Sequence, residues 1–164
     1  MTEKLIAGLA DGGDDDIAIE LTTIGGDAEM ARRMVLEIAL ARRRRRGRLL
    51  FLGKSAVYSA GVTIMSAFPR CDRFLTADTV LLLHERQLSE TSDLSGSIRA
   101  SLALLRTKQA ELENGLRLEQ QTFDRLAVGT GLSADQIRSR AEHAWYVTAK
   151  EAVQLGLVEA LMPD

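Results

Sequence analysis

The spacing of apolar residues changes from a strand period to a helix period near the start of the chain. Ile17, Ile19 and Leu21 alternate with smaller or more polar residues, which predicts a strand with one apolar face. From residue 28 to residue 46 the apolar positions recur every three or four residues. This period predicts an amphipathic helix that begins after Asp27 and ends at Gly47.

Short apolar segments with many small residues follow this helix. The run Leu49–Leu52, closed by Gly53, predicts a buried strand of a parallel sheet. A helix of small residues is predicted over 59–68, ending before Pro69. The segments predicted as two more short strands are residues 73–76 and 79–83.

The second half of the chain is mainly helical in its pattern. Apolar residues recur at helical spacing from Leu94 to Ala127, which predicts one long helix. Ser133 and Thr148 each begin a capping-box pattern, so each is predicted to start a short helix. Residues 157–162 are predicted to form a closing strand.

This order of elements predicts an α/β fold with a mostly parallel sheet. Glycines and aspartates at residues 12–16 interrupt any regular element, so residues 1–15 are predicted to be a flexible leader. A chain of 164 residues has the size of one domain, so residues 16–164 are predicted to be a single domain.

Composition and charge exclude several classes of protein. The net charge of −2 argues against general binding to nucleic acid. The basic run Arg42–Arg46 is either a solvated helix end or a site for an anionic partner. The sequence shows no secretory signal and no apolar run of membrane-spanning length, and its one cysteine, Cys71, suits a reducing compartment. We therefore expect a cytoplasmic protein that does not contact membranes.

Candidate chemistry centres on Ser59, which lies between small residues after a predicted buried strand. A serine nucleophile needs a base, and the chain has two histidines, so the base is His84, His143 or a lysine with a lowered pKa. The N–H of Ala60 at the helix start and one from the Gly25-Gly26 turn could hold an oxyanion. The alternative is that Ser59 is simply a small residue that lets a helix pack closely on the sheet.

Four segments in order resemble the proteolytic subunit of the ATP-dependent Clp protease and its relatives in the Clp/crotonase superfamily. Leu21-Thr22-Thr23-Ile24-Gly25-Gly26 is similar to that family's Asn-Ser-Pro-Gly-Gly turn, Ser59-Ala60-Gly61 to its Ser-Met-Gly nucleophile, and Leu82-Leu83-His84 to its Met-Ile-His. The most specific match is the tail from Tyr146 to Val158, which resembles Phe-(Leu/Met)-Ser-Ala-x-Glu-Ala-Val-x-(Tyr/Leu)-Gly-Leu-Val.

The resemblance implies a Clp/crotonase-type fold, with a mostly parallel sheet of ββα units and a long protruding helix like that family's handle. It implies a serine endopeptidase that acts on peptides or unfolded proteins, with Ser59 as nucleophile, His84 as base and the N–H groups of Gly26 and Ala60 as oxyanion hole. It implies no metal and no organic cofactor. The long helix suggests a homo-oligomer, since its apolar stripe needs a partner, unless it lies across its own domain.

The chain also departs from the family pattern. Ala144 stands at the position of the family's acidic triad residue. Glu142 could reach in from the preceding helix end to replace that acid, and His143 is a weaker candidate. The chain begins close to the Gly-Gly strand, which puts the docking of an ATPase ring in doubt.

These departures leave two rival functions. The first is a catalytically weak or inactive Clp-like subunit that acts in assembly or binding, favoured by Ala144. The second is an acyl-CoA enzyme of the crotonase branch, suggested by Cys71-Asp72 and His84-Glu85. For an acyl-CoA enzyme, however, we expect the chain to be too short to hold the coenzyme-binding elements.

Overall fold

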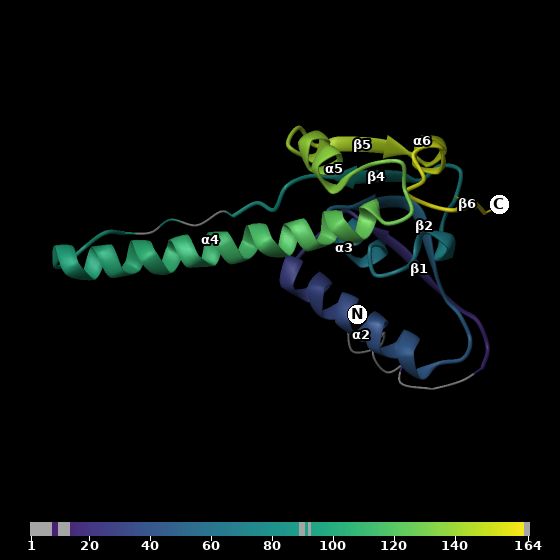
Figure 1. Cartoon of the computed structure of the whole chain (residues 1–164), viewed down its shortest axis with the longest axis horizontal. Coiled ribbons are helices and arrows are strands. Elements are labelled where there is room, and N and C mark those ends of the chain that lie inside the picture. The colour runs from purple at the N-terminus through teal and green to yellow at the C-terminus, as the bar shows by residue number, and fades with distance from the viewer. Residues whose placement is uncertain (1–7, 10–13, 89–90, 92, 163–164) are drawn as a thin grey trace.

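The structure is a computed structural model that describes residues 8–9, 14–88, 91 and 93–162. Its described strands form one sheet in the order β5-β4-β2-β3-β6, with β1 paired to β2 (Figure 1). All strand pairs are parallel except β4 with β5. The strands are β1 (Ile17–Thr23), β2 (Leu49–Tyr58), β3 (Arg73–Leu75), β4 (Val80–Leu83), β5 (Trp145–Thr148) and β6 (Ala160–Leu161). The predicted α/β fold with a mostly parallel sheet is confirmed.

The helices pack around this sheet, except for the far half of the longest one. They are α2 (Ala28–Arg44), α3 (Ala60–Met65), α4 (Ile98–Ala127), α5 (Ala134–Ala141) and α6 (Ala149–Gln154), with a 3-10 turn over Arg70–Asp72. Asp27 caps α2 by accepting a hydrogen bond from the N–H of Met30. Both predicted capping boxes are present, at Ser133 before α5 and at Thr148 before α6.

Strand β2 is longer than the sequence predicted, and this difference positions the site. We expected Gly53 to end the strand, but the strand continues to Tyr58. A Cβ at Gly53 would lie 2.6 Å from a side-chain carbon of Leu75 and 2.8 Å from one of Val57, so glycine is needed here for close packing. The prediction was wrong because a glycine that ends a strand and one that permits close packing look alike in sequence.

The extra length of β2 comes with a change of partner. Its register against β1 shifts between Leu21, paired with Gly53, and Thr23, paired with Val57. Ser55, within this interval, has a φ of 56°. Before the irregularity β2 pairs with β3, and after it β2 pairs with β4. Irregularities of this kind bend a strand and redirect its end, and here that end leads directly into Ser59.

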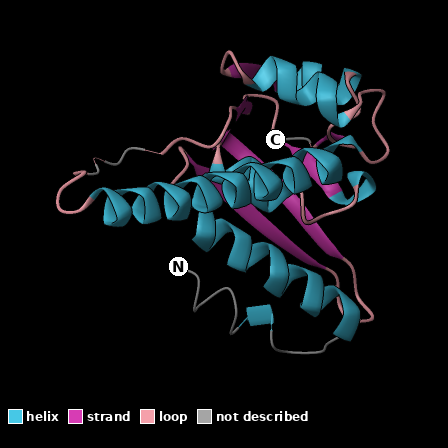
Figure 2. Cartoon of the chain, turned by 60° about the vertical axis from the view of Figure 1, so that its left-hand side comes forward, coloured by secondary structure: helices cyan, strands magenta, loops and turns pink. Residues whose placement is uncertain are grey.

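The long helix α4 projects beyond the sheet, as Figures 1 and 2 show. Its 30 residues correspond to about 45 Å of helix. The buried residues of α4 all lie in its last third: Leu118, Glu119, Phe123 and Leu126. Five large apolar residues nearer its start are exposed: Ile98, Leu102, Leu105, Leu112 and Leu116. The alternative that the whole helix lies across its own domain is therefore wrong, and the handle-like helix is confirmed.

A buried arginine joins β3 to the ends of other elements. Arg73 is 1% exposed and donates hydrogen bonds to the carbonyls of Phe68, Leu157 and Arg125. Burial lowers the pKa of Arg73 to about 10, which still leaves it charged at neutral pH. The C-terminal end of α4 is thus attached to β3 by hydrogen bonds from the charged guanidinium of Arg73 to backbone carbonyls.

The basic run Arg42–Arg46, at the end of α2, is partly buried. Arg42 bonds to the buried carboxylate of Asp72, and Arg45 is 9% exposed and donates to the carbonyl of Asp15. The solvated-end interpretation therefore fits only the exposed residues Arg43, Arg44 and Arg46.

Most of the predicted flexible leader lies outside the described residues. Of the part that is described, Leu9 is 6% exposed and belongs to the hydrophobic core. The single-domain boundary at residue 16 stays a prediction. The predicted closing strand is shorter than expected, because Leu157 and Val158 pack in the core within the turn after α6. Among the described residues, none of the helices contains an apolar segment that could span a bilayer.

Candidate active site

Ser59 lies at the turn between β2 and α3, in a backbone conformation that few residues adopt. Its φ is 53° and its ψ is −109°, a left-handed conformation that normally favours glycine. The N–H of Ser59 donates to the carbonyl of Leu82 at 2.8 Å, which places this turn beside the end of β4. Strained serines at a strand-to-helix turn are typical of nucleophiles, because the turn presents the hydroxyl outside the sheet.

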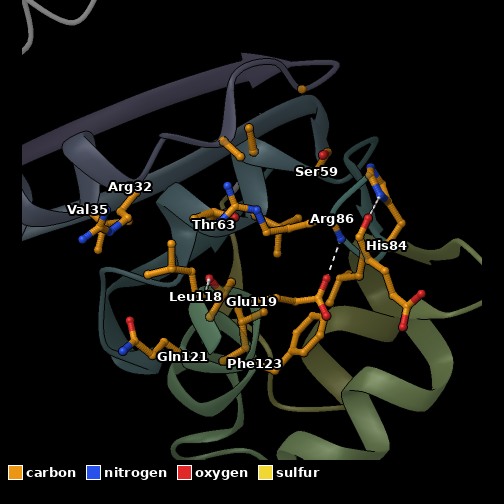
Figure 3. Close-up of a pocket in the computed structure, with 18 of the residues that line it drawn as sticks. Arg32, Val35, Ser59, Thr63, His84, Arg86, Leu118, Glu119, Gln121 and Phe123 are labelled. Carbon is orange, nitrogen blue, oxygen red and sulfur yellow. Dashed lines mark hydrogen bonds between the residues drawn. The ribbon is translucent and has the colours of Figure 1, made fainter. Parts of the chain in front are cut away.

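Ser59 and His84 line one cavity of about 590 Å³ (Figure 3). Its wall is built from the turn after β1, the first turns of α2 and α3, the segment after β4 and the last third of α4. Gly25, Gly26 and Ala60 line the same cavity. The structure therefore brings four of the five predicted site residues together: Ser59, His84, Gly26 and Ala60.

The Gly25-Gly26 turn packs directly against the serine. A Cβ at Gly25 would lie 3.1 Å from the Cβ of Ser59, and the φ of Gly25 is 111°. The N–H of Gly25 donates to Oγ1 of Thr23. Within the described part of the chain, the N–H groups of Gly26 and Ala60 have no hydrogen-bond partner. Unpartnered N–H groups beside a serine are what an oxyanion hole requires.

His84 follows β4 and is half-buried. Its Nδ1 lies 2.5 Å from the carbonyl oxygen of Glu85. Because a carbonyl oxygen only accepts, this contact assigns the hydrogen to Nδ1 and leaves Nε2 as the nitrogen able to take a proton. Ser59 and His84 share the cavity without a direct hydrogen bond, which is common in sites without substrate.

The structure does not bring Glu142 to this cavity. Its carboxylate lies 3.5 Å from a guanidinium nitrogen of Arg138, one turn earlier on α5. His143 is exposed, and Ala144, also exposed, has a φ of 53°. None of the cavity-lining residues is a lysine, and Lys54 instead pairs with Glu20 at 2.6 Å.

Glu119 is a site residue that the sequence analysis missed. It is 6% exposed, lines the cavity and accepts a hydrogen bond from the N–H of Arg86. The side chain of Arg86 turns the other way and bonds to Glu29 at 2.8 Å. This bond lowers the pKa of Glu29 below its usual value. A signal was available, because Glu119 interrupts the apolar stripe of α4 where that stripe enters the core.

The residues behind the acyl-CoA interpretation are not all at this site. Asp72 is 5% exposed and pairs with Arg48 and Arg42, away from the cavity. Cys71 is exposed on the 3-10 turn. No group of three or more His, Cys, Asp or Glu side chains among the described residues is arranged to bind a metal ion.

The fold and the position of the serine define a Clp/crotonase-type α/β protein. The family model described as Clp protease matches residues 1–164, so the chain belongs to the Clp protease family. It is 27% identical over 115 residues to the ATP-dependent Clp protease proteolytic subunit 2 of Pseudomonas aeruginosa. That alignment covers 70% of this chain and 52% of the relative, so the chain spans about half the length of this curated relative.

A solved structure supports the fold over nearly the whole chain. A mutant of ClpP1 from Listeria monocytogenes superposes with a TM-score of 0.73 at 19% identity. The superposition covers 99% of this chain and 84% of that one. The resemblance to the Clp family is thus confirmed at the level of family and fold.

Proposed function

We propose that this protein is a serine endopeptidase that cleaves peptides through an acyl-enzyme on Ser59. The Oγ of Ser59 attacks the peptide carbonyl while its proton passes to Nε2 of His84. The N–H groups of Gly26 and Ala60 hold the oxyanion. The leaving amine then takes the proton from His84, and an ester remains on Ser59.

Water completes the cycle. His84 takes a proton from the water as its oxygen attacks the ester carbonyl, and it returns this proton to Oγ as the new carboxyl group leaves. Every atom in these steps belongs to the substrate, to water or to the four residues named.

The observation that supports this proposal most is the strained backbone of Ser59 at the edge of a cavity shared with His84. A serine that served only for close packing would not require a φ of 53°. Family membership supports the same class of reaction. Peptides or unfolded proteins are the proposed substrates.

We further propose a homo-oligomer in a reducing compartment such as the cytoplasm. The exposed apolar stripe of α4 would be covered by a second copy of the chain. Cys71, exposed and unpaired by any disulfide in the described part of the chain, suits a reducing compartment.

A second candidate function is a weak or inactive subunit that acts in assembly. It is favoured by the lack of a carboxylate at position 144, since loss of the acid from an established triad lowers the rate by about 10⁴.

Labelling with a fluorophosphonate probe, followed by intact mass, separates the two functions. If the protein is a peptidase, we expect one adduct per chain in the wild type and none in Ser59→Ala. In His84→Ala we expect the adduct to form much more slowly. Ser55→Ala is the matched control, because Ser55 also has a positive φ but lies outside the cavity, and its labelling should equal that of the wild type. A folded wild type that takes no label at any protein concentration would contradict the peptidase and support the assembly function.

A further inference from the structure

One peptide group beside His84 is hydrogen-bonded at both of its ends. Its carbonyl oxygen, on Glu85, accepts from Nδ1 of His84, and its N–H, on Arg86, donates to a carboxylate oxygen of Glu119. Both bonds are drawn in Figure 3. A chain of three groups therefore runs from the imidazole through a peptide to a buried carboxylate.

We propose that Glu119 is a positioning residue for His84, acting through this peptide group in place of the carboxylate that position 144 lacks. The proposal rests on the peptidase function proposed above, and it assigns to α4 a role in the chemistry of the site.

The physical basis is the polarisation of one hydrogen bond by the next. A carboxylate that accepts from an amide N–H draws the amide's positive end toward itself and increases the negative charge on its carbonyl oxygen. That oxygen then holds the Nδ1 hydrogen of His84 more firmly, which keeps Nε2 free to accept the proton of Ser59. When His84 becomes a cation, the charge of Glu119 attracts it through the same peptide.

Burial makes this effect larger than it would be in water. Glu119 is 6% exposed, so its charge acts through a medium of low effective dielectric constant. The guanidinium of Arg86 does not neutralise it, because that group is bonded to Glu29 on α2. Glu29 also accepts a hydrogen bond from Arg32, while the backbone N–H of Arg86 donates to Glu119.

A purely structural role is the alternative, in which Glu119 only ties the segment after His84 to α4. Two variants separate the roles. Glu119→Gln keeps a hydrogen-bond acceptor for the N–H of Arg86 but removes the charge, and Glu119→Leu removes both. Gln120→Leu is the matched control, since Gln120 is the neighbouring polar residue on α4 and bonds within the helix to Asp124.

The first readout is the tautomer of His84, measured by NMR on protein with ¹⁵N-labelled histidine. The chain has two histidines, so His84 is assigned by comparison with His143→Gln. We expect the Nδ1–H form in the wild type, a detectable fraction of the Nε2–H form in Glu119→Gln and a larger fraction in Glu119→Leu. The control should match the wild type. An unchanged tautomer in both Glu119 variants would overturn the proposal.

The second readout is the rate constant of fluorophosphonate labelling, with urea unfolding measured alongside it. We expect Glu119→Gln to slow labelling by about tenfold with a smaller effect on stability, because the hydrogen bond survives without its charge. Adding Ala144→Asp should accelerate Glu119→Gln more than it accelerates the wild type, since both carboxylates serve the same imidazole. Equal acceleration in the two backgrounds would contradict the shared role.

The two proposals fail in different ways. If the wild type takes no label, the peptidase function is wrong, but the NMR measurement still decides whether Glu119 sets the tautomer of His84. If the wild type is labelled and both Glu119 variants keep its rate and tautomer, only the role of Glu119 is wrong.

Discussion

Leu83 of β4 is paired with Trp145 of β5 at the end of their antiparallel ladder, so His84 and Ala144 are the next residues along the two strands. The φ of Ala144 is 53°, a left-handed conformation in which Asp and Asn are several-fold enriched over other residues with a side chain. The backbone beside His84 therefore suits an aspartate better than the alanine that it carries.

We expect Ala144→Asp to increase the rate of fluorophosphonate labelling by about tenfold or more, because a carboxylate there could bond directly to His84. Ala144→Asn has nearly the same shape without the charge and is the control. An aspartate variant that reacts no faster than the asparagine variant would show that a carboxylate at position 144 does not act on His84.

We expect Ser59→Gly to be more stable than Ser59→Ala by about 1 kcal/mol in urea unfolding. Glycine adopts the positive φ of this turn without the clash of a Cβ, whereas alanine keeps the strain and removes only the hydroxyl. Both variants should lose labelling. Equal stability of the two would mean that the turn is unstrained, which would remove the main support for the nucleophile.

We expect Asp72→Asn to lower the free energy of unfolding by about 2 kcal/mol, because it removes the buried carboxylate that accepts hydrogen bonds from two arginines. Asp72 pairs with Arg48 and Arg42, and its hydrogen bond to Arg48 raises the pKa of that arginine. Asp135→Asn is the control, since its pair with Arg138 is at the surface and should cost under about 1 kcal/mol. Similar losses in the two variants would contradict this assignment.

We expect Glu29 to make the free energy of unfolding depend on pH in the acid range. Its pKa is lowered from 4.5 mainly by the hydrogen bond from Arg86, so the folded state favours the charged form. This stabilisation is fully present above the unfolded pKa of about 4.5 and is lost as pH falls through the lower folded pKa. The stability difference between wild type and Glu29→Gln, measured by urea unfolding, should therefore shrink as the pH falls below about 4.5.

Arg86→Met tests the cause of this dependence. In the Arg86→Met background, Glu29→Gln should change the free energy of unfolding less at neutral pH than it does in the wild type. Below about pH 4.5, Arg86→Met and the double variant should have similar free energies of unfolding. An undiminished effect of Glu29→Gln would show that Arg86 is not its main partner.

We expect Leu105→Glu combined with Leu112→Glu to convert the proposed oligomer to smaller species, measured by sedimentation velocity over a range of concentrations. Both leucines are exposed on one stripe of α4, and burying a charge without a partner is unfavourable. Thr107→Glu is the control, because 100° per residue places it on the opposite face of the helix. If the double variant and the wild type sediment alike, the stripe is not the contact surface.

Local patterns in the sequence predicted the elements that depend on neighbouring residues. The alternation around Ile19 and the capping boxes at Ser133 and Thr148 are confirmed because each depends on contacts within a few residues. The resemblance to a known family placed Ser59 and His84, which the structure brings to one cavity.

Contacts between distant segments could not be predicted in this way. The carboxylate of Glu119 accepts from the backbone N–H of Arg86, 33 residues earlier, and no local sequence pattern predicts that hydrogen bond. Glu142 was a candidate for the missing acid, but its carboxylate pairs with Arg138, one helical turn away. Strand β2 continues through Gly53, where Leu75 packs too closely to leave room for a Cβ, and the spacing of apolar residues does not reveal this packing.

The change of partners along β2 restricts how the length of this segment can vary between relatives. After the irregularity at Ser55, residues Ala56 to Tyr58 pair with β4, and Ser59 follows without a spacer. One inserted or deleted residue there would turn Val57 from the core to the opposite face and move the serine away from the two glycines. Natural insertions should therefore be absent from residues 54–59, even in relatives whose other segments differ widely in length.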